Sequence, residues 1–295
     1  GIEKTTPADV DRVAHKYIHA DQFALLVVGN DKEFVKPLST LGPVTPIDIS
    51  IPEGTTPQPS TGAEEAAPAK PAQSDAQAKA LLEKFIAFIG GADKVNAVKA
   101  IRQVSSAEQN TPQGTIALDT DTYTVFPDQF HSIVRTAQLP APMHVIVSNA
   151  GAWMSLEGQG TRDMPASMKQ DRLSSIRRGP LAVAQHAGEF VVTLGDKSAD
   201  GQAIDINGAG VSVRWVIDPQ TGRLLRSSFT ASGQAGPVQR TIEFSDWRPA
   251  GGLNLPYKAV VQENGQQAGS EQIKSFEINP KIDPKLFEKP SETPQ

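Results

Sequence analysis

Short segments with alternating apolar and polar residues follow one another from residue 114 to residue 278, and they constrain the fold more than any other feature. The expected strands are residues 114–118, 122–126, 130–136, 144–148, 152–156, 189–193, 203–206, 212–217, 224–231, 238–247, 255–262 and 271–278. Turn signals such as Asn207-Gly208 and Asn264-Gly265 separate several of them. Consecutive strands with this period predict a mainly β domain, an antiparallel meander that curls into a barrel or half-barrel.

Helices are expected at two places in this domain, residues 75–295. Leu81, Leu82, Phe85, Ile86, Phe88 and Ile89 form an apolar helical stripe that ends at Gly90-Gly91, and a short helix holding Val95 and Val98 follows. A helical interlude is expected from residue 165 to about residue 186, interrupted at Gly179-Pro180. The concave face of a half-barrel with such helices would be partly covered by them.

The first 74 residues differ in character. Helical spacing from Val10 to Ile18, a buried strand over residues 23–29, a helix over 31–41 and a short strand at 47–51 predict a small α/β fragment at residues 1–50. Residues 51–74 contain Pro52, Pro57, Pro59, Pro68 and Pro71 and almost no large apolar side chain, which is typical of a linker. The chain starts without Met or a signal peptide, and we read it as a fragment.

Composition excludes several classes of function. The net charge of −5 and the pI near 5.6 give no basic surface for nucleic acid. The longest apolar run, residues 23–28, is far too short to span a bilayer, so no transmembrane segment is expected. The chain has no cysteine and therefore no disulfide, Cys-based zinc site or thiol chemistry.

Catalytic motifs are weak throughout the chain. His15 and His19 share a helix face and could both reach a metal, but no Glu accompanies them as in a zinc peptidase motif, so solvent-facing histidines are the simpler interpretation. A hydrolase would need one of His131, His144 or His186, yet no Gly-x-Ser-x-Gly motif occurs, and no phosphate-binding loop either. Asp119 and Asp121 are expected in a solvated turn. Arg177-Arg178 is either an anion site after a helix or ordinary surface charge. We therefore expect no catalytic and no metal-binding residue.

The remaining possibility is that the domain binds a ligand through the shape of an apolar pocket, and the expected site is inside the curled sheet. The alternative is that the same side chains fill an ordinary core. The candidate lining residues are Val125, Phe130, Ile133, Val145, Val147, Trp153, Met154, Met164, Val191, Trp215 and Phe229.

Two stretches resemble known families. Residues 1–50 resemble the C-terminal end of insulinase/pitrilysin-type zinc peptidases, on the segments at residues 6–17, 21–30 and 37–42. That family's zinc motif, H-x-x-E-H, is not in this chain, so the resemblance places zinc and catalysis in a preceding part of a parent protein, and this chain would be inactive alone and hold no cofactor.

Residues 75–290 resemble the outer-membrane lipoprotein carrier (LolA-like) superfamily. The residues that carry the resemblance are Ile89–Lys94 with Ile101, Asp218–Gly222, Phe244–Arg248 with Leu255-Pro256, and Asn279–Asp283 with Leu286-Phe287. The resemblance implies an unclosed antiparallel β-barrel wrapped on short helices, whose concave apolar face holds acyl chains, and a periplasmic or cell-envelope location.

Two functions follow as expectations. The first is a non-catalytic domain that binds a lipid, an acylated protein or another apolar ligand and is joined to the remaining peptidase domains. The second is an accessory domain of a zinc metalloendopeptidase that presents substrate or anchors the enzyme and has no ligand cavity. A bound apolar ligand would separate the two.

Overall fold

The computed structural model describes Thr6, residues 73–233 and residues 236–290. The chain divides into two units, residues 1–67 and residues 68–295, and nearly all the described residues belong to the second. The α/β fragment, the linker and the His15/His19 pair expected from the sequence therefore lie outside the described residues or almost entirely so. They remain predictions.

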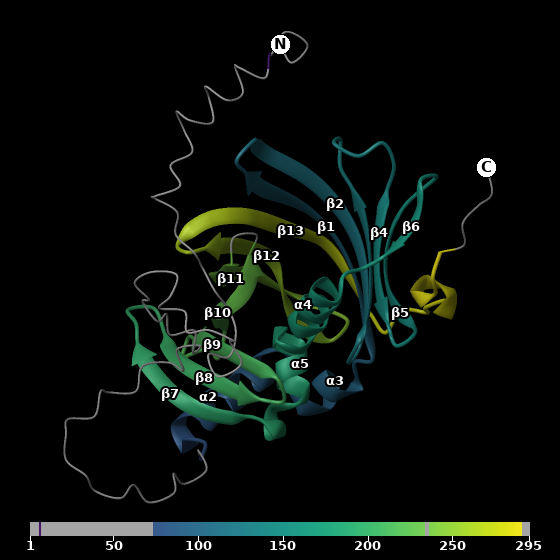
Figure 1. Ribbon diagram of the computed structural model, residues 1–295. Coiled ribbons are helices and arrows are strands. Elements are labelled where there is room, and N and C mark those ends of the chain that lie inside the picture. The colour runs from purple at the N-terminus through teal and green to yellow at the C-terminus, as the bar shows by residue number, and fades with distance from the viewer. Residues whose placement is uncertain (1–5, 7–72, 234–235, 291–295) are drawn as a thin grey trace, which may run out of the picture. The chain divides into compact units, whose positions relative to one another are not determined.

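A single antiparallel sheet of 13 strands dominates the described part of the chain, and it confirms the predicted unclosed half-barrel (Figure 1). The strand order is β6-β5-β4-β3-β2-β1-β13-β12-β11-β10-β9-β8-β7, so β6 and β7 are edges and the sheet does not close. The strands are β1 (Ala100–Thr111), β2 (Gly114–Val125), β3 (Gln129–Arg135), β4 (Met143–Ser148), β5 (Gly151–Leu156), β6 (Gly160–Asp163), β7 (Val191–Lys197), β8 (Gln202–Gly208), β9 (Val211–Ile217), β10 (Leu224–Gly233), β11 (Gly236–Ala250), β12 (Leu253–Glu263) and β13 (Gln266–Ile278).

The sequence interpretation was wrong about the centre of the sheet. Strand β1 was not predicted, and β2 was predicted as two strands with Asp119 and Asp121 in a turn between them. In the structure β1 and β2 form one long hairpin. Asp121 pairs with Arg102 at 2.8 Å and Asp119 pairs with Lys274 at 2.6 Å, both across strands. The polarity of these residues suggested a turn, but ion pairs to other strands accommodate them within a strand.

The helices match the predicted stripes. They are α2 (Ala76–Phe88), α3 (Ala92–Ala97), α4 (Ala166–Arg177) and α5 (Pro180–Gln185), with short 3-10 turns η5 (Ala187–Glu189) and η6 (Pro284–Phe287). Helix α2 buries Leu81, Leu82 and Phe85 in the main core. The ring of Phe85 meets that of Trp215 on β9 edge-to-face, with centroids 5.0 Å apart. The sheet curls around α4 and α5 (Figure 1).

A turn at residues 218–222 docks against α2. The carboxylate of Asp218 accepts hydrogen bonds from the Gln220 amide (2.9 Å) and the Thr221 hydroxyl (2.6 Å). Lys84 Nζ donates to the carbonyl of Pro219 at 2.9 Å. Gly222 has a φ of +77°, and a Cβ there would lie 2.5 Å from the carbonyl oxygen of Lys84. The position therefore needs glycine both for its backbone conformation and for the close approach of the helix.

Replacing Gly222 by alanine is expected to lower the free energy of unfolding by about 2–4 kcal/mol, because a left-handed conformation and a backbone clash add. Gly265→Ala is the matched control, since Gly265 has a similar φ of +80° and nothing within 4 Å of its would-be Cβ. That variant should cost only about 1 kcal/mol. Urea unfolding of both variants measures the difference, and equal losses would mean that the turn does not dock on α2 as described.

Candidate functional site

A cavity of about 500 Å³ lies between the concave face of the sheet and helices α4 and α5. Its size is that of ordinary small-molecule pockets, roughly 300–1,000 Å³. The apolar part of the lining is Ile101, Phe126, Phe130, Ile176, Pro180, Leu181, Ala182, Phe244, Leu255, Pro256, Ala259, Ile273 and Phe276. The described part of the chain therefore has a partly open pocket with a mainly apolar lining.

Strand register explains which side chains reach this cavity. In the β1–β2 hairpin Ile101 is opposite Thr124 and Gln103 is opposite Thr122, and on β3 Ser132 is opposite Thr122. Cross-strand partners share a face of the sheet, so these residues form rows on the concave side. The middle of the wall is thus polar, with Gln103, Thr120, Thr122, Thr124 and Ser132, and the apolar residues lie around it.

Glu271 on β13 is the acidic residue of the cavity wall. Its Oε1 accepts hydrogen bonds from the Ser105 hydroxyl at 2.6 Å and from the Gln103 amide at 2.8 Å. Ser105 also meets Thr120, with 2.7 Å between the two hydroxyl oxygens. A carboxylate with charge-assisted hydrogen bonds from two neighbours is held firmly in place. The polar belt on the concave face is therefore ordered and not simply lined with solvated hydroxyls.

Helix α4 contributes the opposite charge. Arg172, Ser175 and Ile176 of α4 line the cavity, at the i, i+3 and i+4 spacing of one helix face, and Gly179 at the start of α5 lines it as well. The guanidinium of Arg172 lies over the ring of Phe130, 5.7 Å from its centroid. Burial lowers the pKa of Arg172, and the positive charge of Arg240 lowers it further. The cavity thus has one basic and one acidic side chain in an otherwise uncharged lining.

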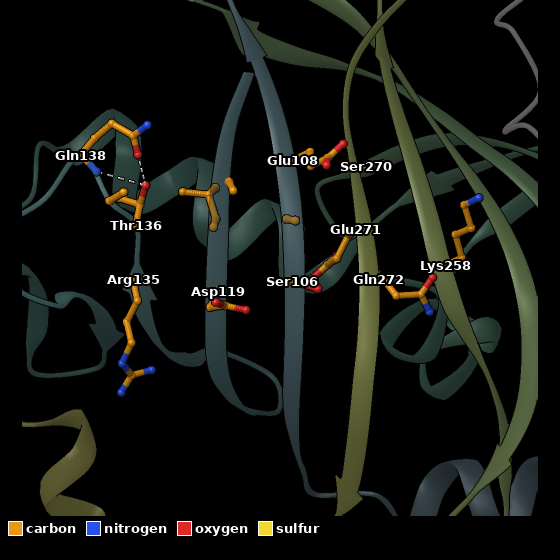
Figure 2. A pocket seen from close by; sticks show the side chains of 14 residues that line it. Ser106, Glu108, Asp119, Arg135, Thr136, Gln138, Lys258, Ser270, Glu271 and Gln272 are labelled. Atoms are coloured by element: carbon orange, nitrogen blue, oxygen red, sulfur yellow. Dashed lines mark hydrogen bonds between the residues drawn. The ribbon is translucent and has the colours of Figure 1, made fainter. Parts of the chain in front are cut away.

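A second pocket of about 640 Å³ adjoins the sheet near the β3–β4 connection (Figure 2). Strands β1, β2 and β13 supply most of its lining, together with residues 135–138 and Lys258. Glu271 lines both pockets. This second pocket is richer in charged side chains, including Glu108, Asp119, Arg135 and Lys258 (Figure 2), and so it suits a polar group better than a hydrocarbon chain.

The structure places the eleven predicted lining residues in several different parts of the fold. Phe130 lines the cavity. Val145, Val147, Met154 and Met164 pack with Phe130 in a small cluster, and Trp215 and Phe229 belong to the main core. Register places Val125, Ile133 and Trp153 on the sheet face opposite Phe130, while Val191 alternates with the core residue Val192. Contact of any of them with a ligand remains a prediction.

Sequence reasoning missed most residues that line the cavity. Ile176 and Leu181 lie in the predicted helical interlude, and Ile273 and Phe276 lie in a predicted strand, but nothing in the sequence orients these elements toward one another. Nothing in the sequence singles out Arg172 or Glu271. The only local signal was the spacing of Arg172 and Ile176, one helical turn apart.

No group of three or more His, Asp or Glu side chains able to hold a metal occurs among the described residues. Within the same residues, no helix is long and apolar enough to cross a membrane. The three histidines considered for a hydrolase separate into two groups, since His186 pairs with Glu189 at 2.8 Å while His131 and His144 meet each other on the convex face.

The two histidines of the convex face form a chain of hydrogen bonds that ends at the carboxylate of Glu157. His144 Nε2 lies 2.9 Å from Glu157 Oε1, and His144 Nδ1 lies 2.9 Å from His131 Nε2. Because an ionised carboxylate only accepts hydrogen bonds, we assign His144 Nε2 as donor, which makes its Nδ1 the acceptor from His131. His131 Nδ1 is buried without a partner among the described residues, and the ring packs against Phe287 of η6. Burial and nearby His144 lower the pKa of His131 to about 4.

This chain of hydrogen bonds predicts acid sensitivity. Since the folded pKa of His131 lies below the ordinary value of 6.5, the unfolded chain binds more protons between those two values, and stability falls as the pH falls through that window. We expect a loss of up to about 3 kcal/mol between pH 6.5 and 4. Urea unfolding at several pH values should show it. His131→Gln should flatten the dependence, and an unchanged slope in that variant would assign it to other groups.

Comparison with known proteins adds solved structures only, since no family model and no curated protein matches the chain. A DUF1329 family protein from Desulfovibrio piger matches with a TM-score of 0.49 at 12% identity, over 72% of this chain and 97% of its own. A LolA superfamily protein from Nitrosomonas europaea matches with a TM-score of 0.47 at 13% identity, over 72% and 97%. A putative outer membrane lipoprotein-sorting protein domain from Vibrio parahaemolyticus matches with a TM-score of 0.43 at 10% identity, over 72% and 96%. The function must therefore be argued from the geometry of the cavity.

Proposed function

We propose that residues 75–295 form a non-catalytic binding domain that holds an apolar or amphipathic ligand, such as a lipid or an acyl chain, in the cavity between the concave sheet and helices α4 and α5. The observation that carries the proposal is the cavity of about 500 Å³ with a mainly apolar lining. Burial of hydrocarbon there would be favourable by about 25 cal/mol per Å². The cavity favours this function over an accessory domain whose core is filled.

The direct test is organic extraction of the purified chain followed by mass spectrometry, with thermal melts before and after delipidation. A ligand that binds only the folded state raises the melting midpoint. A co-purifying acyl lipid in stoichiometric amount, with a lower midpoint after its removal, would support the proposal. If the extract contains no lipid and added fatty acids do not shift the midpoint, the proposal fails.

The link to a zinc metalloendopeptidase is a separate proposal, and only the resemblance of residues 1–50 supports it. The periplasmic or envelope location is also a proposal, and the resemblance of residues 75–290 supports it. In this proposal the binding domain serves peptidase domains that precede it in a longer protein. The sequence upstream of Gly1 tests it, because an H-x-x-E-H motif should be found there. A parent gene without that motif would remove the peptidase from the account and leave the cavity unaffected.

A further inference from the structure

Three arginine side chains gather where helix α4 faces the sheet. Arg172 lines the cavity, and Arg178 at the C-terminal end of α4 lies over the ring of Phe229 on β10, 4.0 Å from its centroid. Arg240 on β11 pairs with Phe229 in the sheet register. The positive charge of Arg240 lowers the pKa of both helical arginines, in addition to the effect of their burial. Arg240 is thus close enough to Arg172 and to Arg178 to repel both.

The neutralisation of this cluster is incomplete within the described part of the chain. Glu263 forms an ion pair with Arg240. Asp171 is near Arg172 and Arg178, but its carboxylate accepts its hydrogen bond from the Ser232 hydroxyl, at 3.2 Å. Among the described residues no carboxylate lies within ion-pair distance of Arg172 or Arg178, and Arg178 Nε is buried without a hydrogen-bond partner. Arg172 is exposed, so an incoming anion can reach its guanidinium, and Arg178 Nε is the buried atom of the cluster that lacks an acceptor.

Glu271 does not supply this anion. It lines the same cavity as Arg172, yet the two form no ion pair, and its Oε1 is already bonded to Ser105 and Gln103. The acidic side chain is therefore held on the β13 wall, while Arg172 of α4 forms no ion pair within the described residues. A ligand with a cationic head group would instead bind Glu271. Binding of a cationic amphiphile is therefore the alternative to test.

We propose that the ligand of this cavity is an anionic amphiphile, whose carboxylate or phosphate head group binds Arg172 and whose hydrocarbon chain lies along Ile176 and Ile273. This inference rests on the proposed function and specifies its ligand class. Arg172 is suited to the role because a guanidinium binds carboxylate and phosphate oxygens through two parallel hydrogen bonds. Arg178 adds positive charge from the same helix.

Amphiphiles with one chain and different head groups test the proposal. Dodecanoate, dodecyl phosphate, dodecyl maltoside and dodecyltrimethylammonium, each below its micellar concentration, would displace the uncharged fluorescent probe N-phenyl-1-naphthylamine from the full chain. We expect the two anions to bind roughly tenfold tighter than the maltoside, the effect of one charged hydrogen-bonded contact. The carboxylate and phosphate arms identify which anion is preferred.

Variants locate the head group. Arg172→Gln should abolish the preference for anions while leaving maltoside binding unchanged, and Arg172→Lys should restore part of it. Glu271→Gln should leave the preference intact. Thermal melts confirm that each variant is folded. Arg178→Gln removes the second basic side chain near the cavity and is measured for comparison. Tightest binding of the cation, weakened by Glu271→Gln, would overturn the anionic ligand but keep the cavity. Equal binding of all four probes would also overturn it. If no probe binds, the proposed function fails as well.

Discussion

Replacing Phe85 by alanine should lower the free energy of unfolding by about 3–5 kcal/mol, the cost of a cavity in place of a buried aromatic ring. The side chain of Phe85 has no exposed surface and meets both Trp215 and Trp247 edge-to-face, at centroid distances of 5.0 and 6.4 Å. It therefore joins helix α2 to strands β9 and β11. Urea unfolding followed by circular dichroism would measure the loss.

Phe88→Ala on the same helix is the graded control. Phe88 is only partly buried, and the centroid of its ring lies 5.1 Å from that of Trp247. It should cost about 1–2 kcal/mol, less than Phe85, because less apolar surface is lost from the core. If the two variants lost equal stability, or if Phe85→Ala lost less than Phe88→Ala, the described packing of α2 against the sheet would be contradicted.

Replacing Thr124 by tryptophan should weaken binding of a dodecyl amphiphile by more than tenfold, which corresponds to at least about 1.4 kcal/mol. Thr124 lines the cavity on β2, opposite Ile101 and Phe130, and aromatic residues are well tolerated in strands. The indole ring would occupy the space in which we place the hydrocarbon chain. Fluorescent-probe displacement with dodecanoate measures the effect.

The matched control puts the same side chain on the other face of the same strand. Thr115 lies an odd number of residues from Thr124 and is exposed, so a tryptophan there points away from the cavity. Thr115→Trp should bind dodecanoate as the unaltered chain does. Equal weakening by both variants would indicate a general disturbance of β2, and no weakening by Thr124→Trp would place the ligand elsewhere.

The sequence was sufficient for elements whose burial is local. The stripe of α2, the break at Gly179-Pro180 and the alternating strands from β7 to β13 could be predicted because each has one apolar face and clear turn residues around it. Strand β1 could not, because its concave row contains Gln103 and Ser105, and both of these polar residues donate hydrogen bonds to Glu271 on β13, far away in the sequence.

The candidate site depends even more on tertiary structure. Phe130 was predicted to line a pocket and does, but Ile176, Ile273 and Arg172 were not predicted. A buried apolar residue can fill a core or border a cavity, and only the packing of α4 and α5 across the sheet separates the two. Likewise Asp121 pairs with Arg102 on the neighbouring strand β1, and Asp119 pairs with Lys274 on β13, one strand further away. Both pairings follow from register, which the sequence does not specify by itself.

The most direct test of the central claim is photo-cross-linking of the full chain with a fatty acid that carries a diazirine in its alkyl chain, followed by mass spectrometry of the peptides. The account predicts adducts on the cavity lining, in particular on Ile176 of α4 and on Ile273 and Phe276 of β13, and their loss in Thr124→Trp. Adducts confined to the convex face around His131 and His144, or labelling that Thr124→Trp does not reduce, would contradict it.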